Sequence, residues 1–570
     1  MKHRIFKFSF FLGALALASS CNDDFEALPV EQYTIDFIFS KTDSLGVNAR
    51  QYLTTVYSQL QNGHNRVGDD YLDAASDDAV SSATVVVDIT KLGTGQYNAV
   101  SQVPSDMRWA NYYAGIRSAT TFITNIEVVP LRDKLPNGIP MAKVWKSEAR
   151  FIRAMHYFEL LKRYGGVPLM GNRVLVLGED VELPRNTFEE CVNYIIGECD
   201  AIKDSLRTYP IADLNANSHV VTKEAALALK TRVLLYAASP LYNGGNIDPD
   251  NALTGYTNYD VNRWKLAVDA AEDFMDQNTY FSLAPNFIKL FITDNNHETI
   301  FFRSGGAGTN IEKNNGPVGF SGANQGLGRT SPSQNLVDAF LTINGKFITD
   351  PGSGYDPTNP YANRDPRLNA TVFHNGSLWL NASLETFQGG RHRPGGQIQQ
   401  TKTGYYMRKF MGEFETAQNY GDTPHDWPAF RYAEILLNYA EAQNEFAGPT
   451  TEVYDAIRSI RQRAGIQSGG GTYGLEAGLT QEEMRVAIRN ERRIELAFEE
   501  HRYWDIRRWK IAEEVFSTPV NGVIIVKAGA QLNFNIVPVQ DATFGEKRYF
   551  YPISFDEVIK NGNMVQNPQW

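Results

Sequence analysis

Residues 489–509, RNERRIELAFEEHRYWDIRRW, bring together side chains that could do acid–base chemistry. Eleven of these 21 residues are Asp, Glu or Arg, and apolar residues such as Ile494, Phe498 and Trp504 run between them. A glycoside hydrolase uses two carboxyl groups that face each other across a cleft, roughly 5 to 9.5 Å apart. The stretch is therefore either a catalytic element or a charged structural helix.

Helical spacing favours the structural interpretation. Residues 480–516 read as one continuous helix, which opens with the capping box Thr480/Glu483. One face of that helix would carry Glu491, Glu495, Phe498, Arg502, Asp505 and Trp509. Two glutamates on one helix project to the same side and leave no room for a sugar ring between them. Arg492, Arg502 and Arg508 are expected to hold these carboxylates ionised, whereas a general acid must be protonated. We interpret the charge as scaffolding, in which Arg–carboxylate pairs and apolar anchors fix the helix to its neighbours.

The composition bounds the class of protein. A chain of 570 residues with 42% hydrophobic and 21% charged residues is an ordinary globular protein, and its length suggests roughly two to four domains. The net charge of −11 argues against nucleic acid or an anionic membrane surface as the main partner. Cys191 and Cys199 lie eight residues apart on a predicted helix, about 12 Å along its axis, so buried thiols are expected and no disulfide. The histidines and cysteines show no metal-binding pattern, and no cofactor is predicted.

The N-terminus has the features of an export signal. A basic start, MKHRIFK, is followed by the apolar run FSFFLGALALA and by small residues that lead into Cys21. The arrangement is similar to the lipobox of bacterial lipoproteins, which implies a signal peptide over residues 1–20 and acylation of Cys21. A plain secretory peptide cleaved nearby is the alternative. Asn22, Asp23 and Asp24 resemble the acidic tag of Bacteroidetes lipoproteins that face the cell exterior, and residues 21–45 read as a lipidated tether.

Most of the remaining chain is predicted to be helical. Helical periodicity or helix-forming composition marks residues 144–164, 188–206, 221–238, 262–277, 430–446 and 453–464, in addition to 480–516. Thr187 and Glu190 form a capping box, and small residues such as Ala226, Ala267 and Ala440 would let antiparallel helices approach closely. The pattern predicts a mostly α protein built from tetratricopeptide-like helix pairs, with minor β structure such as a strand at residues 85–89, VVVDI.

The middle of the chain differs from the rest in amino-acid composition. It is rich in Gly, Asn and Pro, and few helical periods occur between about residues 280 and 425. We divide the chain into a helical region over 46–280 and a second region over 281–570, which holds a loop-rich insertion at about 303–425. Long irregular segments usually carry function, so recognition is expected here.

Several stretches along the whole chain share one resemblance. They are residues 489–510, and EARFIRAMHYFELLKRYGGVPL, TKEAALALKTRVLLYAASPLYN, SPSQNLVDAF, YANRDPRL, WPAFRYAEILLNYAEAQNE and YPISFDEVIKNGNMVQNPQW. Together they resemble the SusD/RagB family of outer-membrane nutrient-binding lipoproteins. The resemblance implies a non-catalytic protein with a SusD-like α-α superhelix and a loop-built site, anchored by lipid in the outer membrane and facing the exterior. It also implies a partner, a SusC-type TonB-dependent transporter, to which glycans or, in some relatives, peptides are delivered.

The resemblance points to candidate ligand contacts. In glycan-binding relatives, aromatic side chains do this work on the loop before the helix that opens with WANYYAG and on the central loops. The corresponding candidates here are Tyr71, Tyr97, Trp109, Phe320, Asn324 and Arg329. Trp109 opens a helix, so core packing is an alternative role for it. Leu327 stands where some relatives carry a tryptophan, which argues against a starch-type aromatic platform.

Three further patterns are open to more than one interpretation. The motif GGRHRP (389–394) could grip an acidic sugar or form an exposed loop. The stretch IDPDNALTGYTNYD (247–260) has oxygen ligands suited to calcium but lacks EF-hand spacing. The abundance of carboxylates would also allow a secreted glycosidase, which needs two acids facing each other across a cleft.

Overall fold

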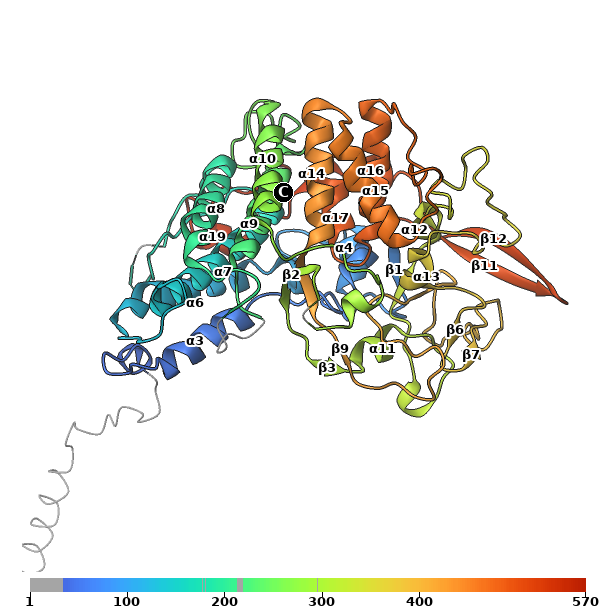
Figure 1. Cartoon of the computed structure of the whole chain (residues 1–570), viewed down its shortest axis with the longest axis horizontal. Coiled ribbons are helices and arrows are strands. Elements are labelled where there is room, and N and C mark those ends of the chain that lie inside the picture. The colour runs from blue at the N-terminus through green and yellow to red at the C-terminus, as the bar shows by residue number, and fades with distance from the viewer. Residues whose placement is uncertain (1–33, 177, 180, 213–218, 295) are drawn as a thin grey trace, which may run out of the picture.

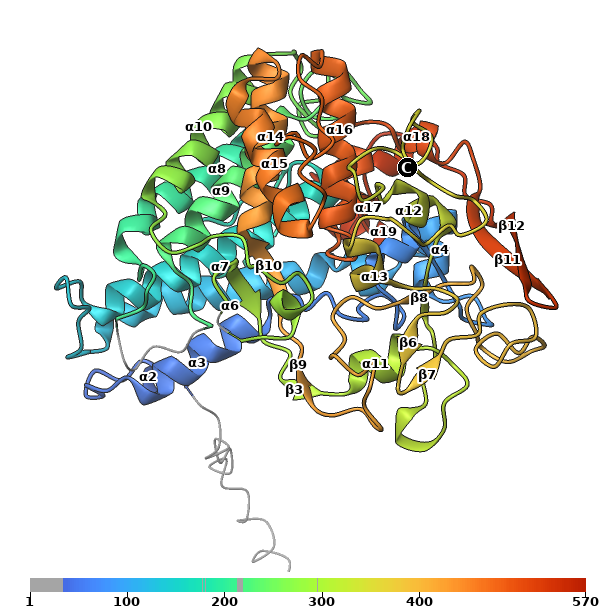
Figure 2. The same cartoon turned by 45° about the vertical axis from the view of Figure 1, so that its right-hand side comes forward.

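The body of the protein is a stack of long helices. The computed structural model describes residues 34–570 except 177, 180, 213–218 and 295, so Cys21 and the predicted signal peptide lie outside the described residues. The long helices are α3 (Val47–Ser58), α6 (Trp109–Asn125), α7 (Met141–Tyr164), α8 (Phe188–Ile202), α9 (Lys223–Ala238), α10 (Asn262–Gln277), α14 (Tyr432–Ala447), α15 (Thr451–Ala464) and α16 (Gln481–Glu495). Each packs on the next from α6 to α10, and α14 then joins α10 to α15 and α16 (Figures 1 and 2).

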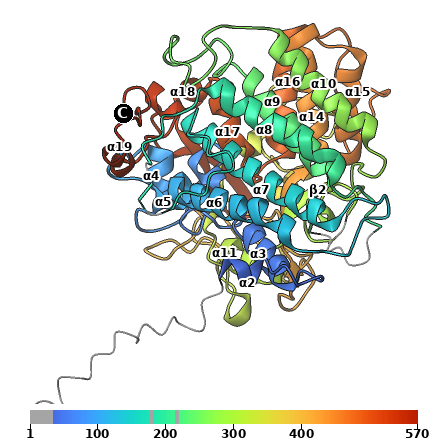
Figure 3. The same cartoon turned by 90° about the vertical axis from the view of Figure 1, so that its left-hand side faces the viewer.

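This stack confirms the predicted fold class. Helices α8 to α10 and α14 to α16 form consecutive antiparallel layers, and α3 lies against α6 and α7 at one end (Figure 3). Ala226, Ala267 and Ala440 are fully or almost fully buried between helices, as their small size predicted. The Thr187/Glu190 and Thr480/Glu483 capping boxes both form. Cys191 and Cys199 are free buried thiols. No helix in the described residues is long and apolar enough to cross a bilayer.

In the part of the chain that the structure describes, the strands form six separate antiparallel pairs. These are β1 (Ala79–Ser81) with β4 (Thr330–Pro332), β2 (Thr299–Arg303) with β10 (Trp427–Arg431), β3 (Ala307–Gly308) with β9 (Thr423–Pro424), β5 (Val372–Phe373) with β8 (Tyr406–Met407), β6 (Leu378–Trp379) with β7 (Ala382–Ser383), and β11 (Val520–Ala528) with β12 (Gln531–Gln540). The last pair is a long hairpin that projects from the body (Figure 1).

Short helices complete the chain. They are α2 (Ile35–Ile38), α4 (Asp88–Thr94), α5 (Pro104–Met107), α11 (Asn310–Asn315), α12 (Gln334–Ala339), α13 (Arg367–Thr371), α17 (His501–Arg508), α18 (Ala512–Val515) and α19 (Phe555–Lys560), with 3-10 turns η1 (Leu72–Ala75), η2 (Ile126–Val128), η3 (Lys203–Ser205), η4 (Lys289–Phe291), η5 (Gly322–Asn324) and η6 (Glu546–Tyr549). The predicted strand at 85–89 is wrong. Val85 and Val86 are exposed loop residues and α4 begins at Asp88, so Ile89 reaches the core from a helix and not from a strand.

The predicted continuous helix over 480–516 is also wrong. Helix α16 ends at Glu495, and α17 begins at His501 after two residues in the left-handed region, Phe498 and Glu500, each with φ of 62°. Lys409 Nζ donates to the carbonyls of Glu495 and Ala497 at 3.2 and 2.8 Å, so a cation satisfies the carbonyls at the end of α16. The break therefore depends on a residue far away in the sequence.

A second distant residue fixes the turn after α16. Asp73 Oδ1 accepts a hydrogen bond from the Phe498 backbone N–H at 2.9 Å. The Phe498 ring is fully buried and lies edge-on to Tyr71. A left-handed conformation is costly for a bulky residue, and these two contacts hold it. The predicted single charged face is thus split between two helices.

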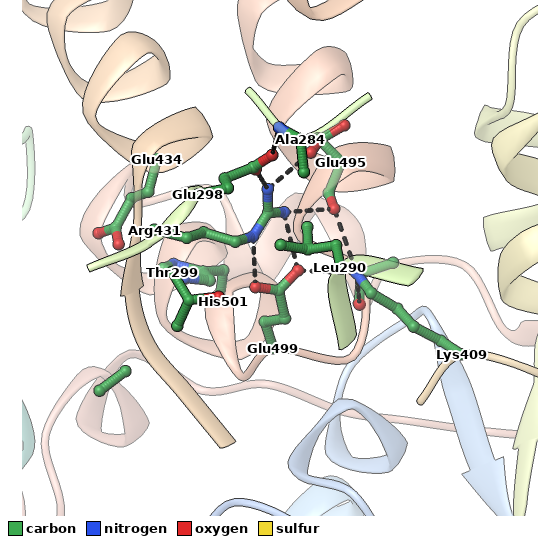
Figure 4. Close-up of polar contacts among 12 residues, drawn as sticks. Ala284, Leu290, Glu298, Thr299, Lys409, Arg431, Glu434, Glu495, Glu499 and His501 are labelled. Carbon is green, nitrogen blue, oxygen red and sulfur yellow. Dashed lines mark hydrogen bonds and ion pairs between the residues drawn. The ribbon is translucent and has the colours of Figure 1, made fainter. Parts of the chain in front are cut away.

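Glu495 and Glu499 of the charged stretch belong to a buried ion-pair network around Arg431 (Figure 4). Arg431 Nε lies 2.7 Å from Glu499, and its Nη1 lies 2.8 Å from Glu298 and 2.7 Å from Glu495. Lys409 also contacts Glu499, at 2.7 Å. The stretch is therefore anchored to β2, β10 and the segment that contains Lys409.

The network continues along the same face of α16 to Glu491. Arg367 binds Asp365, Glu491 and Glu495 at 2.7 to 2.8 Å, Arg461 binds Glu491, and Arg463 binds Glu298 and Glu495. Five cations thus meet five carboxylates, and no side chain of the ten is more than 4% exposed. Burial by itself raises the pKa of Glu495, but Arg463, Arg431 and Arg367 hold that pKa well below its usual range.

The prediction that Arg–carboxylate pairs pin the stretch is confirmed, but the predicted partners are wrong. Arg492 binds Asp505, Arg502 binds Asp77, and Arg508 binds Asp505 and Glu441. Arg502 and Arg508 lie on α17, beyond the helix break, and Arg492 lies on α16 but binds Asp505 of α17. Their carboxylate partners come instead from η1 and the residues after it, from α14 and from α17 itself.

Candidate ligand-binding site

An open pocket of about 460 Å³ lies between the loop-rich insertion and the base of the β11–β12 hairpin. Its walls come from three segments: the loop after β1, the loop over residues 388–402, and the hairpin. The lining residues are Ser82, Thr84, Gln388, Arg393, Gly395, Gly396, Ile398, Gln400, Thr401, Lys402, Ile524 and Val539. The first loop and the central insertion, both predicted to carry recognition, therefore meet at this pocket.

The β1–β4 pair delivers the first wall. Strand β1 pairs with β4 from Ala79 to Ser81, and the Ser82 backbone N–H extends the pairing by donating to the Arg329 carbonyl at 2.7 Å. The Gln399 side chain then donates to Ser82 Oγ and to the Leu327 carbonyl. These contacts fix residues 82–84 at the pocket rim.

Buried polar contacts hold the second wall, the loop over residues 388–402. The Tyr406 hydroxyl donates to the His392 carbonyl at 2.6 Å, and His392 Nδ1 accepts from the Glu385 backbone N–H at 2.9 Å. Burial lowers the pKa of His392 to about 4, so the ring is neutral at physiological pH and can accept this hydrogen bond. The loop is thus anchored from inside, while Gly395, Gly396 and Ile398 remain exposed.

Gly404 brings the same loop into direct contact with β11. Its φ is +88°, and a Cβ atom there would lie 2.7 Å from the Val523 carbonyl oxygen and 3.0 Å from Arg393 Nη1. The Val523 backbone N–H donates to the Thr403 carbonyl at 2.7 Å, and Gln388 N–H donates to the Ile525 carbonyl at 2.8 Å. The loop therefore covers the edge of β11 that β12 does not use.

The lining combines hydrogen-bonding and cationic side chains with a few aliphatic ones. Ser82, Thr84, Gln388 and Gln400 can donate and accept hydrogen bonds, as hydroxyl-rich or amide-rich ligands require. Arg393 and Lys402 add positive charge, and burial lowers the pKa of each from its ordinary value. No Asp, Glu or aromatic residue lies among the lining residues. The pocket therefore offers no pair of carboxylates of the kind that hydrolyses a glycosidic bond.

Three of the predicted site residues lie near this pocket without lining it. Phe320 is half-buried, with its ring centroid 5.0 Å from that of His392, so it supports the loop. Asn324 donates to the Gln418 carbonyl, and Arg329 lies 3.3 Å from Asp70. Phe320 and Arg329 thus contact segments next to the pocket, whereas Asn324 binds residues 418–420, outside the pocket walls.

The other three predicted residues lie elsewhere and are buried. Tyr71 stacks on Phe410, and Tyr97 stacks on Trp570, each with ring centroids 5.6 Å apart. Trp109 is 7% exposed and lines a separate, largely apolar pocket of about 440 Å³ between α6 and α19. The structure does not bring the six residues together, and their role as ligand contacts stays a prediction.

The sequence interpretation missed Gln388, Gln400 and Lys402 as lining residues. The motif GGRHRP had drawn attention to Arg393, and the structure places that residue at the pocket wall while Arg391 points to solvent. Glycines and glutamines carry little signal of their own, because their function depends on where the loop folds. Among the described residues, no group of three His, Cys, Asp or Glu side chains could hold a metal ion.

Comparison with known proteins places this architecture in one class. A family model described as "SusD family" matches residues 297–570, and one described as "Starch-binding associating with outer membrane" matches residues 39–235. The crystal structure of a SusD-like protein from Bacteroides fragilis superposes with a TM-score of 0.73 at 25% identity, covering 94% of this chain and 98% of that one. A SusD-like carbohydrate binding protein from the same species gives 0.71 at 23% identity, covering 92% and 99%.

Curated relatives match most or nearly all of the chain. SusD-like protein P38 from Formosa agariphila is 24% identical, covering 97% of this chain and 96% of that protein. SusD-like protein P2 from the same organism is 23% identical over 80% of this chain and 79% of its own length. The chain is thus a SusD-like protein by fold, and it belongs to the SusD/RagB family.

Proposed function

We propose that the protein is a non-catalytic lipoprotein that captures oligosaccharides in the pocket between residues 82–84, 388–402 and the β11–β12 hairpin. The observation that carries the proposal is the lining itself, in which side-chain hydroxyl, amide and cationic groups converge without a carboxylate pair. Membership in a family with members described as carbohydrate binding supports it. The captured ligand would pass to a SusC-type TonB-dependent transporter in the outer membrane.

The direct test is removal of one hydrogen-bonding group from the pocket. Gln388 lines the pocket, and within the described residues its side-chain amide makes no hydrogen bond to the protein. We expect Gln388→Ala to weaken oligosaccharide binding about fivefold, because a net hydrogen bond contributes about 1 kcal/mol. Isothermal titration calorimetry of the full chain in detergent measures this, with the exposed Gln325→Ala as a matched control.

The same samples test the absence of turnover. Chromatography of the oligosaccharide after prolonged incubation should recover it intact. Shortened products that depend on the folded protein would contradict a purely binding role, and equal binding by Gln388→Ala and the wild type would contradict this pocket as the site.

Membrane attachment and the partner are tested separately. We expect a labelled fatty acid supplied to growing cells to be incorporated into the protein and Cys21→Ala to release it from the membrane fraction, because acyl chains provide the anchor. Purification from membranes in mild detergent should recover a TonB-dependent transporter with the wild type. A Cys21→Ala protein that leaves the membrane fraction but still carries the labelled fatty acid would count against acylation at Cys21. Purification of the wild type without such a transporter would count against the proposed partner.

A peptide ligand is the second candidate, and a specific feature of the lining favours it. Ile398 is 63% exposed at the rim, and Ile524 and Val539 line the pocket while no aromatic ring does. Sugars pack on aromatic faces, whereas extended peptides use backbone hydrogen bonds and aliphatic contacts. Peptides that co-purify and are identified by mass spectrometry would favour this candidate, and a clear hit on a sugar array would count against it.

A further inference from the structure

The charges at the pocket all have one sign. The chain as a whole carries a net charge of −11, yet Arg393 and Lys402 line the pocket and no Asp or Glu does. A local excess of positive charge in an acidic protein needs a physical reason, because each buried or half-buried cation loses hydration. Such a cation is usually paired with a carboxylate of the same protein.

Arg393 has only carbonyl partners. Its Nη1 donates to the Val523 carbonyl at 2.6 Å and its Nη2 to the Lys402 carbonyl at 3.2 Å. No carboxylate of the described residues lies within ion-pair distance of its guanidinium. These bonds hold the planar group in place and leave its charge uncompensated, with N–H donors still available.

Lys402 is held in the same way. Its Nζ donates to the Ala83 carbonyl at 3.1 Å, which uses one of three donors. Burial lowers the pKa of Lys402, and Asp70 opposes that lowering only in part. Asp70 is itself fully buried and already accepts hydrogen bonds from Ser81, Thr330 and Arg329. Asp70 therefore does not reach the ammonium group as an ion-pair partner. The two cations extend from one loop on either side of the glycine turn at 395–396.

The neighbouring arginine behaves differently and provides an internal contrast. Arg391 lies outside the lining, donates to the Gly319 carbonyl, and stacks on Phe320 at 5.0 Å. Its charge faces solvent, where hydration compensates it. Within the motif GGRHRP, Arg391 therefore faces solvent and Arg393 lies at the pocket wall, and the buried His392 separates them.

We propose that the pocket recognises acidic oligosaccharides, and that Arg393 and Lys402 bind their uronate carboxylate or sulfate ester groups. This inference rests on the proposed function, because it names the class of ligand for the same site. Guanidinium and ammonium groups that are fixed by carbonyls and lack acidic partners form charge-assisted hydrogen bonds with such anions. Neighbouring Thr84, Gln388 and Gln400 would bind the sugar hydroxyls.

The experiment compares three oligosaccharides of equal length by calorimetry with the full chain in detergent. One is a neutral glucan, one carries uronate groups, and one carries sulfate groups. We expect at least one acidic oligosaccharide to bind more tightly than the neutral one and to lose affinity at high salt. Arg393→Gln and Lys402→Gln should each weaken that binding about tenfold, because a charged hydrogen bond is lost. Arg391→Gln should leave it unchanged.

Comparing the affinities of the uronate-bearing and the sulfate-bearing oligosaccharide identifies which anion the site prefers. Acidic oligosaccharides that bind no more tightly than the neutral one, or that bind Arg393→Gln and Lys402→Gln as well as the wild type, would overturn the inference while the proposed function stands. Failure of all three oligosaccharides to bind would overturn both. Equal thermal midpoints for the variants and the wild type establish that a loss of binding does not come from unfolding.

Discussion

Replacing Arg431 by methionine is expected to lower the free energy of unfolding by about 3–5 kcal/mol, because it leaves buried carboxylates without their central partner. Arg431 contacts Glu298, Glu495 and Glu499, and it also donates to the Glu495 carbonyl at the end of α16. Methionine keeps the apolar stem and removes only the charged head, so cavity formation adds little. The loss arises from electrostatics and from the uncapped end of the helix.

Equilibrium unfolding in urea, followed by circular dichroism, measures this change. The matched control is Lys289→Met, which removes an exposed cation 3.8 Å from Glu413; its expected effect is under about 0.5 kcal/mol, because solvent screens such a pair. Similar effects of the two substitutions would contradict a special role for the network.

Replacing Asp73 by asparagine is expected to stabilise the protein increasingly as the pH rises. Burial raises the pKa of Asp73 to about 8, and nearby Asp78 adds to the effect. Below about pH 4 the carboxyl is protonated in both the folded and the unfolded state, so it causes no pH dependence. Between pH 4 and 8 the unfolded chain releases this proton and the folded chain retains it, which costs the wild type up to roughly 1.4 kcal/mol for each pH unit. Asparagine removes that cost and keeps an oxygen for the Phe498 N–H.

Unfolding free energies of wild type and Asp73→Asn, measured from pH 4 to 8, test the sign. Asp106→Asn is the informative contrast. Burial by itself raises the pKa of Asp106, but Arg163 and Arg66 hold it well below its usual range, so its ionised form stabilises the fold. Asp106→Asn should therefore destabilise the protein by a nearly constant amount from pH 4 to 8, because the stability that ionised Asp106 provides is lost only below about pH 4. A difference between wild type and Asp73→Asn that stays constant across the range would refute the assigned role of Asp73.

The helices of this protein are predictable because their signals are local. The capping boxes at Thr187 and Thr480 and the small residues at helix contacts lie within the segments that they shape. The break after Glu495 has no such signal, because Lys409, Arg431 and Asp73 impose it from distant parts of the chain. Periodicity alone extends a helix through that position.

The candidate site likewise combines residues that local sequence patterns indicate with residues that they do not. Composition predicts a recognition region in the central insertion, and the basic motif draws attention to Arg393, which lines the candidate pocket. The third wall comes from β11 and β12, more than 100 residues further along the chain, and Ile524 and Val539 give no local sign of lining a pocket. Residues chosen for their aromatic character, such as Tyr71 and Tyr97, are buried by contacts with Phe410 and Trp570 that no local pattern reveals.

The equal numbers of cations and anions around Arg431 and Arg367 also constrain how this sequence can diverge. A mutation that neutralises one of the ten groups leaves an unpaired opposite charge in the interior. Two matched mutations, such as loss of Lys409 together with Glu499, restore equal numbers of buried positive and negative charges. The first of the two steps still produces a poorly folding protein. Related sequences are therefore expected to keep or lose these ten groups together, whereas no such charge balance constrains the loop over 388–402.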